Sequence, residues 1–222
     1  MPVMPPRPLI TALIPDQELV FSTANGDAGI LSNNGDISLR TAPYDNKTIQ
    51  CLAVDEKNIY AAHVSLSGDI NELTVYSRLN GTIWEQRPID GQIRGLVPAG
   101  DKLLVFLQTP SGAEIMEYDP GNFILTEMNF LPDEQIQSVI KISDSQLFLL
   151  TEERVIIYEP ATNRFEDFTD EPYNFCRYDP LSDIIFLARD NMIYGFDRVT
   201  GDIIEEKAFT EEVLDFQILY NK

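Results

Sequence analysis

A short polar turn that follows an aromatic or aliphatic strand end recurs along this chain, and it constrains the fold more than any other feature. The turn is clearest at residues 118–123, Tyr-Asp-Pro-Gly-Asn-Phe, and looser copies stand at residues 31–35, 76–81, 158–163 and 196–201. Most copies combine an Asp, Glu or Ser that can bond the turn backbone with a Gly or Asn able to adopt positive φ. Such turns join antiparallel strands, as in hairpins with a glycine at a bulge. The chain is therefore predicted to be a repeat protein.

Two short apolar strands, separated by a polar break, precede each turn. A third strand leads into the turn, and a fourth leaves it. The spacing between equivalent first strands is about 38 to 44 residues, the range of propeller blades, measured between Ile10, Ile49, Ile93, Ile136, Phe175 and Val213. We therefore expect an all-β fold, a β-propeller of four-stranded antiparallel blades. A β-sandwich would also suit short strands, but it has no reason to repeat its turn chemistry.

The repeat also predicts the domain organisation. A Pro-rich arm over residues 1–8 precedes a single propeller domain over residues 9–222. Its five blades are expected at residues 9–42, 48–90, 92–131, 135–169 and 173–209. A surplus first strand at residues 211–220 is expected to pair with N-terminal strands, because an open propeller would leave two strand edges unpaired. A six-bladed or incomplete propeller is the alternative.

The charge of the chain limits its partners. Its 222 residues carry 36 acidic and 16 basic side chains, a formal charge of −20. Such a surface repels nucleic acid and anionic membranes, whereas it aids solubility and suits a basic protein partner. The sequence has no apolar run of the length of a signal peptide or a membrane span. We therefore expect a soluble cytoplasmic protein, unless the chain was cut from a longer secreted precursor.

The aromatic-Asp-x-x-Thr-Gly form of the turn, clearest at residues 196–201, resembles the blades of quinoprotein-like (PQQ-repeat) and YVTN-type propellers. The resemblance covers nearly the whole chain but is confined to the turns. Quinoprotein repeats typically place a Trp after the turn, and here only Trp84, which follows Asn80 and Gly81, has that position. The resemblance implies a propeller fold, and it brings no cofactor residues with it. The WD dipeptide of WD40 blades and the Asp-box of sialidase-like propellers are absent from the sequence.

The usual catalytic side chains are scarce. His63 is the only histidine, so no multi-histidine metal centre or relay can form, and no Gly-x-Ser-x-Gly elbow accompanies it. We expect His63 to have a structural or surface role. Cys51 and Cys176 lack CxxC spacing and are interpreted as buried free thiols, although a single bridge between them is an alternative. The glycines near Asn25 lack the lysine and helix of a phosphate-binding loop and indicate a hairpin turn.

Carboxylates are the only plentiful reactive groups. They form three clusters, namely Asp167 with Asp170 and Glu171, Glu205 with Glu206, and Glu211 with Glu212 and Asp215. Paired carboxylates can hydrolyse glycosides, but these fall in turns and outer strands, where acids usually solvate an edge. The ligand spacing of a calcium loop is missing. The sequence therefore predicts no catalytic, cofactor-binding or metal-binding residues, and no cofactor.

Binding by shape is the remaining function. Residues 64–72 and 109–114 are predicted to extend the connections between second and third strands in neighbouring blades, and loops on a rigid scaffold carry function. We therefore expect a non-catalytic protein-interaction scaffold or a subunit of a larger assembly. The alternative is a propeller that binds small ligands or carbohydrate, or hydrolyses glycosides, through acidic residues of its central funnel.

Overall fold

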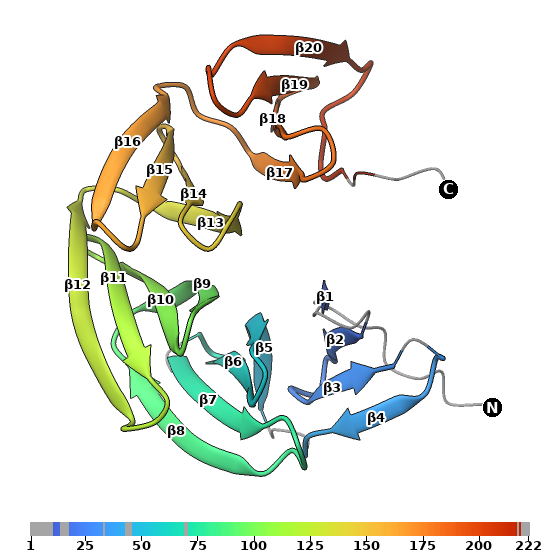
Figure 1. The fold of residues 1–222 in the computed structure, drawn as a ribbon, viewed down its shortest axis with the longest axis vertical. Helices are drawn as coiled ribbons and strands as arrows, with labels where there is room; N and C mark the ends of the chain where they lie inside the picture. The colour runs from blue at the N-terminus through green and yellow to red at the C-terminus, as the bar shows by residue number, and fades with distance from the viewer. Residues whose placement is uncertain are drawn as a thin grey trace. The chain divides into compact units, whose positions relative to one another are not determined.

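The computed structural model describes residues 11–13, 18–32, 34–42, 46–68, 71–216 and 218 (Figure 1). Within these residues, twenty strands form five four-stranded antiparallel sheets, and there is no helix. Each sheet is a meander in which strands consecutive in sequence lie side by side. The predicted fold class, an all-β protein with five four-stranded propeller blades, is confirmed.

The strands have the following bounds. The first sheet contains β1 (Thr11–Leu13), β2 (Leu19–Ser22), β3 (Ala28–Leu31) and β4 (Ile37–Arg40). The second contains β5 (Lys47–Val54), β6 (Asn58–Ser65), β7 (Asn71–Ser77) and β8 (Ile83–Ile89). The third contains β9 (Gln92–Ala99), β10 (Lys102–Thr109), β11 (Gly112–Asp119) and β12 (Ile124–Pro132). The fourth contains β13 (Ile136–Lys141), β14 (Leu147–Thr151), β15 (Val155–Glu159) and β16 (Arg164–Thr169). The fifth contains β17 (Phe175–Asp179), β18 (Ile184–Arg189), β19 (Met192–Asp197) and β20 (Ile203–Ala208).

The chain divides into two compact units. Unit 1 comprises Met1–Pro110 and Ile115–Glu127, and unit 2 comprises Ser111–Glu114 and Met128–Lys222. Buried clusters fill unit 1 where the first sheet meets the second and where the second meets the third. In unit 2, a cluster that includes Phe148 and Leu187 joins the fourth and fifth sheets. Apolar burial between neighbouring blades therefore holds each unit together.

Burial falls from the middle to the outer strands of the blades. In β10, the five residues from Leu103 to Leu107 are all buried. The strand is therefore covered on both faces, which explains why its apolar residues follow one another without alternation. In contrast, all six residues of the outer strand β20 are exposed. Glu205, Glu206 and Lys207 on β20 place charges on a sheet edge, where they discourage pairing with other chains.

The recurring turns are held by their own side chains. Asp197 Oδ1 accepts hydrogen bonds from the backbone N–H groups of Val199 and Thr200 at 2.9 and 2.8 Å. Gly201, at φ 73°, closes the bulge by donating to Asp197 O at 2.9 Å. The turn at Asp119 has the same side-chain bonds, to the N–H groups of Gly121 and Asn122 at 2.8 and 3.2 Å. The carboxylate therefore fixes the turn from within, as the repeat predicts.

One turn differs from the sequence prediction. We expected Gly121 or Asn122 to take the positive φ of the turn at residues 118–123, but Phe123 takes it, at φ 57°. In the copy at residues 158–163, Asn163 takes the positive φ, at 53°, as expected. The Asp119 carboxylate accepts hydrogen bonds from the N–H groups of Gly121 and Asn122, and positive φ occurs at the next residue, Phe123. A bulky residue at positive φ is unusual and locally unfavourable.

The second residue after the bonding Asp, Glu or Ser is here called the tip residue. In the recurring turns the tip residues are Asn34, Leu79, Gly121, Ala161 and Val199, and Leu181 has the corresponding place after Asp179 in the turn between β17 and β18. Three of them are aliphatic side chains that point into solvent, with exposed fractions of 90% for Leu79, 78% for Leu181 and 76% for Val199. The backbone N–H groups of Leu79, Gly121, Leu181 and Val199 donate to the Ser or Asp side chain two residues earlier, for example Leu181 to Asp179 Oδ1 at 2.9 Å. The turns therefore present exposed residues on a fixed backbone.

The aromatic residue of the motif ties one blade to the one before it. Tyr118 on β11 is fully buried, and its hydroxyl donates to Glu85 on β8. Its ring also packs edge to face on Tyr60, with the centroids 6.4 Å apart. In unit 2, the Tyr158 hydroxyl donates to Asn163 Oδ1 at 3.0 Å, and Asn163 Nδ2 donates to the Met128 carbonyl oxygen of β12 at 3.1 Å. The tyrosine therefore has a structural role.

Of the two connections expected to be extended, one needs correction. Residues 109–114 do not form an extended loop, because only Pro110 and Ser111 separate β10 from β11. Gly112 permits this tight connection, since it has φ 144° and a Cβ there would collide with the Leu131 carbonyl oxygen. The connection from β6 to β7 does span residues 66–70, of which 69 and 70 lie outside the described residues.

The expected closing strand at residues 211–220 is not observed as a strand. Residues 211–216 and 218 have no strand structure, and residues 217, 219 and 220 lie outside the described residues. Instead, Val213 donates its backbone N–H to Asp190 O of the fifth sheet at 2.7 Å. Arg177 on β17 binds Asp215 at 2.7 Å and lies over the Phe216 ring. This segment is therefore held by contacts with the fifth sheet. The predicted arm at residues 1–8 also lies outside the described residues.

Candidate functional site

A groove in unit 1 is the best candidate for a functional site. In an antiparallel meander, the turns from first to second strand and from third to fourth strand lie at the same end of the sheet. Three such turns of the second and third sheets, together with Trp84 on β8, line a hollow of about 690 Å³. Its lining residues are Asp55, Glu56, Lys57, Asn58, Trp84, Gly100, Asp101, Asp119, Pro120 and Gly121. Short, fixed turns from two blades therefore build this site.

A second hollow adjoins the first and shares Trp84, Glu56 and Lys57 with it. It has a volume of about 460 Å³ and is completed by Ser77, Arg78 and Leu79. Trp84, the second residue of β8, is 48% exposed. We refer to the two hollows together as the Trp84 groove. An indole that stays half in water while touching two hollows is available to a binding partner.

Two of the carboxylates in the Trp84 groove are committed to the fold. Asp55 accepts the Tyr60 hydroxyl at 2.5 Å, the Asn58 side-chain amide at 3.1 Å and the backbone N–H groups of Lys57 and Asn58 at 2.7 and 2.6 Å. The hydrogen bond from Lys102, at 2.5 Å, holds the pKa of Asp119 well below its usual range. Burial and the bond to Asp55 raise the pKa of Tyr60. These groups hold the turns in place.

The other two carboxylates are free. Glu56 and Asp101 are exposed, and neither makes a hydrogen bond or an ion pair with any residue that the structure describes. The Trp84 indole N–H likewise has no acceptor among the described residues. The Trp84 groove thus offers two exposed carboxylates without an ion pair to a described residue, one donor and an aromatic face; of the carboxylates, Asp101 interacts electrostatically with Lys102. These groups can attract a cation and an apolar side chain.

His63 lies elsewhere and is a core residue, in agreement with its expected structural role. It is 1% exposed on β6. One ring nitrogen, Nε2, lies 3.1 Å from the Gly26 carbonyl oxygen of the first sheet, and Nδ1 lies 3.0 Å from Thr74 Oγ1. Burial lowers the pKa of His63. The histidine therefore joins the first and second sheets.

Both cysteines are free thiols on first strands, Cys51 on β5 and Cys176 on β17. Cys51 is half-buried, and Cys176 is buried. Burial raises the pKa of each thiol to about 12. A thiol with such a pKa is a poor nucleophile at neutral pH, because the thiolate is the reactive form.

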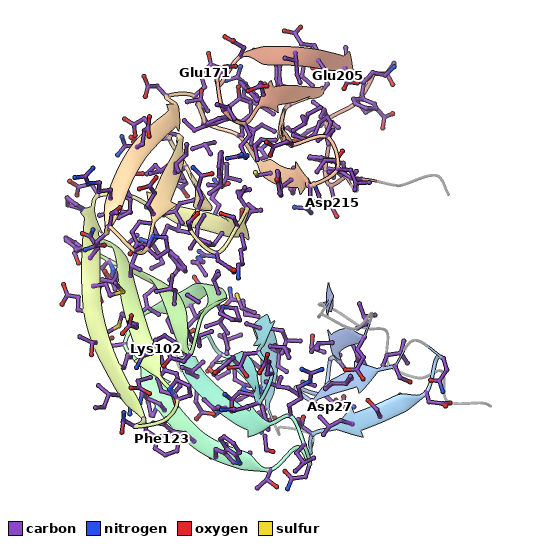
Figure 2. The ribbon with its side chains drawn as sticks, in the orientation of Figure 1. Asp27, Lys102, Phe123, Glu171, Glu205 and Asp215 are labelled. Atoms are coloured by element: carbon purple, nitrogen blue, oxygen red, sulfur yellow. The ribbon has the colours of Figure 1, made fainter. Side chains whose placement is uncertain are left out.

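The three predicted carboxylate clusters do not converge on a site. Figure 2 shows Glu171, Glu205 and Asp215 at separate places on unit 2. Arg154 binds Asp167 and Arg189 binds Glu171, each at 2.7 Å. Glu205 and Glu206 lie on the exposed edge strand β20. Across the described part of the chain, no three His, Cys, Asp or Glu side chains come together as metal ligands would.

The described residues also include no helix that could span a membrane. The Trp84 groove itself was missed by reasoning from the sequence, which indicated the connections at the other end of the strands. The available signal was the single tryptophan of the chain beside acidic turns. Its neighbours in the groove, such as Asp101 and Gly121, come from another blade and are brought together only by folding.

Comparisons with known proteins show similarity of fold alone. No family model and no curated protein matches the chain. Among solved structures, the extracellular domain of BT4673 from B. thetaiotaomicron has 15% identity and a TM-score of 0.64. The match covers 95% of this chain but 29% of that chain. A functionally unknown protein from Desulfotomaculum acetoxidans DSM 771 has 10% identity and a TM-score of 0.65, with coverage of 90% and 69%.

A third similar structure is KlHsv2 with its loop 6CD replaced by a Gly-Ser linker. It has 13% identity and a TM-score of 0.64, and the match covers 94% of this chain and 68% of that chain. This chain therefore spans less than a third of the first of these structures and about two thirds of the other two. At such identities the likeness carries no information on ligands.

Proposed function

We propose that this chain is a non-catalytic binding protein, a scaffold or a subunit of a larger assembly, that engages a protein partner through the Trp84 groove. The observation that carries the proposal is Trp84 itself, half-exposed between two hollows beside the free carboxylates of Glu56 and Asp101. Tryptophan is enriched among the residues that dominate binding energy at protein interfaces. The acidic surface of the chain favours a basic partner.

The chemistry of the groove supports binding over catalysis. Glycoside hydrolysis needs one carboxyl group whose pKa is raised so that it can donate a proton. The pKa of Asp119 is shifted in the opposite direction by Lys102. The Asp55 carboxylate accepts hydrogen bonds from the Tyr60 hydroxyl and from the backbone N–H of Lys57 in its own turn. We therefore propose that the Trp84 groove binds a partner and does not hydrolyse glycosides.

The likeness of the turns to quinoprotein-like and YVTN-type propellers fits a structural role. The turn carboxylates Asp119 and Asp197 bind their own backbone, which gives these turns a function that needs no cofactor. A cytoplasmic location remains the proposal that the sequence favours.

Capture of partners from a native lysate tests the proposal. Wild-type protein should retain a protein at a stoichiometric ratio, and Trp84→Ala should lose it. The matched control is Leu181→Ala, which removes a similarly exposed apolar side chain from a turn of unit 2 and should retain the partner. A parallel thermal-shift screen of glycans and metabolites tests the alternative. A small molecule that raises the melting temperature, with no protein retained, would show that the groove serves a small ligand.

A further inference from the structure

We infer that the Trp84 groove binds a short segment of the partner chain in which an arginine or lysine lies next to an apolar residue. The cationic side chain enters the hollow that carries Glu56 and Asp101, and the apolar side chain packs on Leu79 in the adjoining hollow. This inference rests on the proposed function, because it names the chemistry that the partner must present to this groove.

The charge of the larger hollow selects a cation. Its four carboxylates are Asp55, Glu56, Asp101 and Asp119. Lys102 pairs with Asp119, and turn N–H groups and the Tyr60 hydroxyl occupy Asp55. Glu56 and Asp101 make no ion pair or hydrogen bond with a described residue, although Asp101 also feels the charge of Lys102. Trp84 lines the same hollow, and its face offers a cation–π contact to a guanidinium or ammonium group. A neutral segment would leave both carboxylates without a partner.

The smaller hollow selects an apolar neighbour. Leu79 is 90% exposed, and its backbone N–H donates to Ser77 Oγ at 3.3 Å, so the side chain projects from a fixed turn. Arg78, which also lines this hollow, does not repel a cationic segment. Its guanidinium binds Glu18 at 2.9 Å and the Asp55 carbonyl oxygen at 3.2 Å, so its charge is already neutralised.

The pairing of the two hollows sets the size of the segment. Because both hollows share Trp84, Glu56 and Lys57, adjacent residues of one extended segment can reach both at once. Lys57 is the exposed cation at the shared boundary, and it disfavours a second positive charge there. The site therefore fits one cationic residue beside one apolar residue better than a run of basic residues.

Three synthetic peptides separate charge from apolar contact. The probe is acetyl-Arg-Leu-Gly-Gly-amide, and its controls are acetyl-Gln-Leu-Gly-Gly-amide and acetyl-Arg-Gly-Gly-Gly-amide. Trp84 is the only tryptophan of the chain, so its emission reports on the groove directly. The probe should shift this emission on titration and bind more tightly than either control. Its affinity should fall as salt is added, because the free carboxylates are exposed and easily screened.

Matched variants place the peptide in the groove. In the double variant Glu56→Gln with Asp101→Asn, the affinity for the probe should fall about fivefold, because two exposed charge contacts are lost. The affinity should also depend less on salt. Leu79→Ser should weaken the probe but leave the arginine-only peptide unchanged. The control, Glu205→Gln with Glu206→Gln, removes two exposed charges from β20 and should leave every affinity unchanged.

The outcomes distinguish this inference from the proposed function. Equal binding of the probe to the wild type and to the Glu56/Asp101 double variant, or equal binding of all three peptides, overturns the inference. If the lysate partner is then still lost on Trp84→Ala, the groove binds a protein of different chemistry, and the proposed function stands. If no protein is retained from the lysate while the probe binds as expected, the proposed function fails by itself.

Discussion

Replacing Tyr118 with phenylalanine removes one hydrogen bond and keeps the ring that packs between the second and third blades. The lost hydroxyl donates to Glu85 Oε2, whose side chain is 15% exposed. A hydrogen bond to a charged group contributes about 1.5 to 3 kcal/mol. Since Glu85 Oε1 still accepts two bonds from Arg87, and water can reach the carboxylate, we expect a loss at the low end, about 1.5 kcal/mol.

A similar bond in unit 2 provides the control. The Tyr178 hydroxyl donates to Asp183 at 2.8 Å, but this carboxylate is 46% exposed and also binds Arg198 at 2.6 Å. Tyr178→Phe should therefore cost about 0.5 kcal/mol, as expected for a contact that water can replace. Comparison of the two variants separates the hydroxyl that ties two blades from one that does not.

Urea unfolding followed by the emission of Trp84 measures the effect of Tyr118→Phe. Trp84 is next to Glu85 and belongs to unit 1, so its emission reports the unfolding of the part of the chain that contains Tyr118. The midpoint should fall with an unchanged slope. Tyr178 belongs to unit 2, so the control is followed by circular dichroism. If the midpoint of Tyr118→Phe equals that of the wild type, or if its loss of unfolding free energy is no larger than that of Tyr178→Phe, the hydroxyl of the repeated motif does not tie the blades together.

Other perturbations probe the turns, the core histidine and metal independence. Gly201→Val should lower the free energy of unfolding by about 1 to 3 kcal/mol, because valine is strained at a φ of 73°. The added Cβ itself has room, since its nearest neighbour, Phe168, is 4.0 Å away. An unchanged urea midpoint would contradict the turn assignment. Burial lowers the pKa of His63, which also interacts with the charges of Glu72 and Lys47. As the pH falls below about 6.5, His63 is protonated in the unfolded chain before it is protonated in the folded chain, so the free energy of unfolding decreases. In His63→Asn, the urea midpoint should no longer fall as the pH drops below about 6.5. A midpoint that still falls would show that other groups cause the pH dependence. Addition of EDTA should leave the melting temperature unchanged, and a fall would indicate a metal that stabilises the fold.

The fold was predictable because its signals are local. An Asp at the end of a strand, such as Asp197, and a glycine four residues later, such as Gly201, determine a turn without help from the rest of the chain. Repetition of this turn every blade then indicates five four-stranded sheets. The exact position of positive φ depends on which backbone N–H groups the carboxylate takes, and for this reason Phe123, and not Gly121, adopts it.

The candidate site was less accessible to sequence reasoning, because it depends on contacts between blades. Trp84 and Asp101 line one hollow although they belong to different sheets. The apolar pattern of residues 211–220 suggested a strand, but Val213 and Asp215 bind the fifth sheet through single contacts that no periodicity encodes. The pairing of charges also depends on the fold, since only the folded chain shows that Lys102 forms its ion pair with Asp119 and not with the adjacent Asp101.

The tip residues separate the stability of each turn from the chemistry that it displays. The bonds that close the turn at Asp197 go to backbone N–H groups, so the side chain of Val199 adds nothing to them. The same holds at Leu181, whose side chain is 78% exposed. Substitutions at such exposed positions usually change stability by no more than about 0.5 kcal/mol. Natural drift or a combinatorial library can therefore vary the tips one by one, and the same scaffold can acquire new binding specificities without first being stabilised.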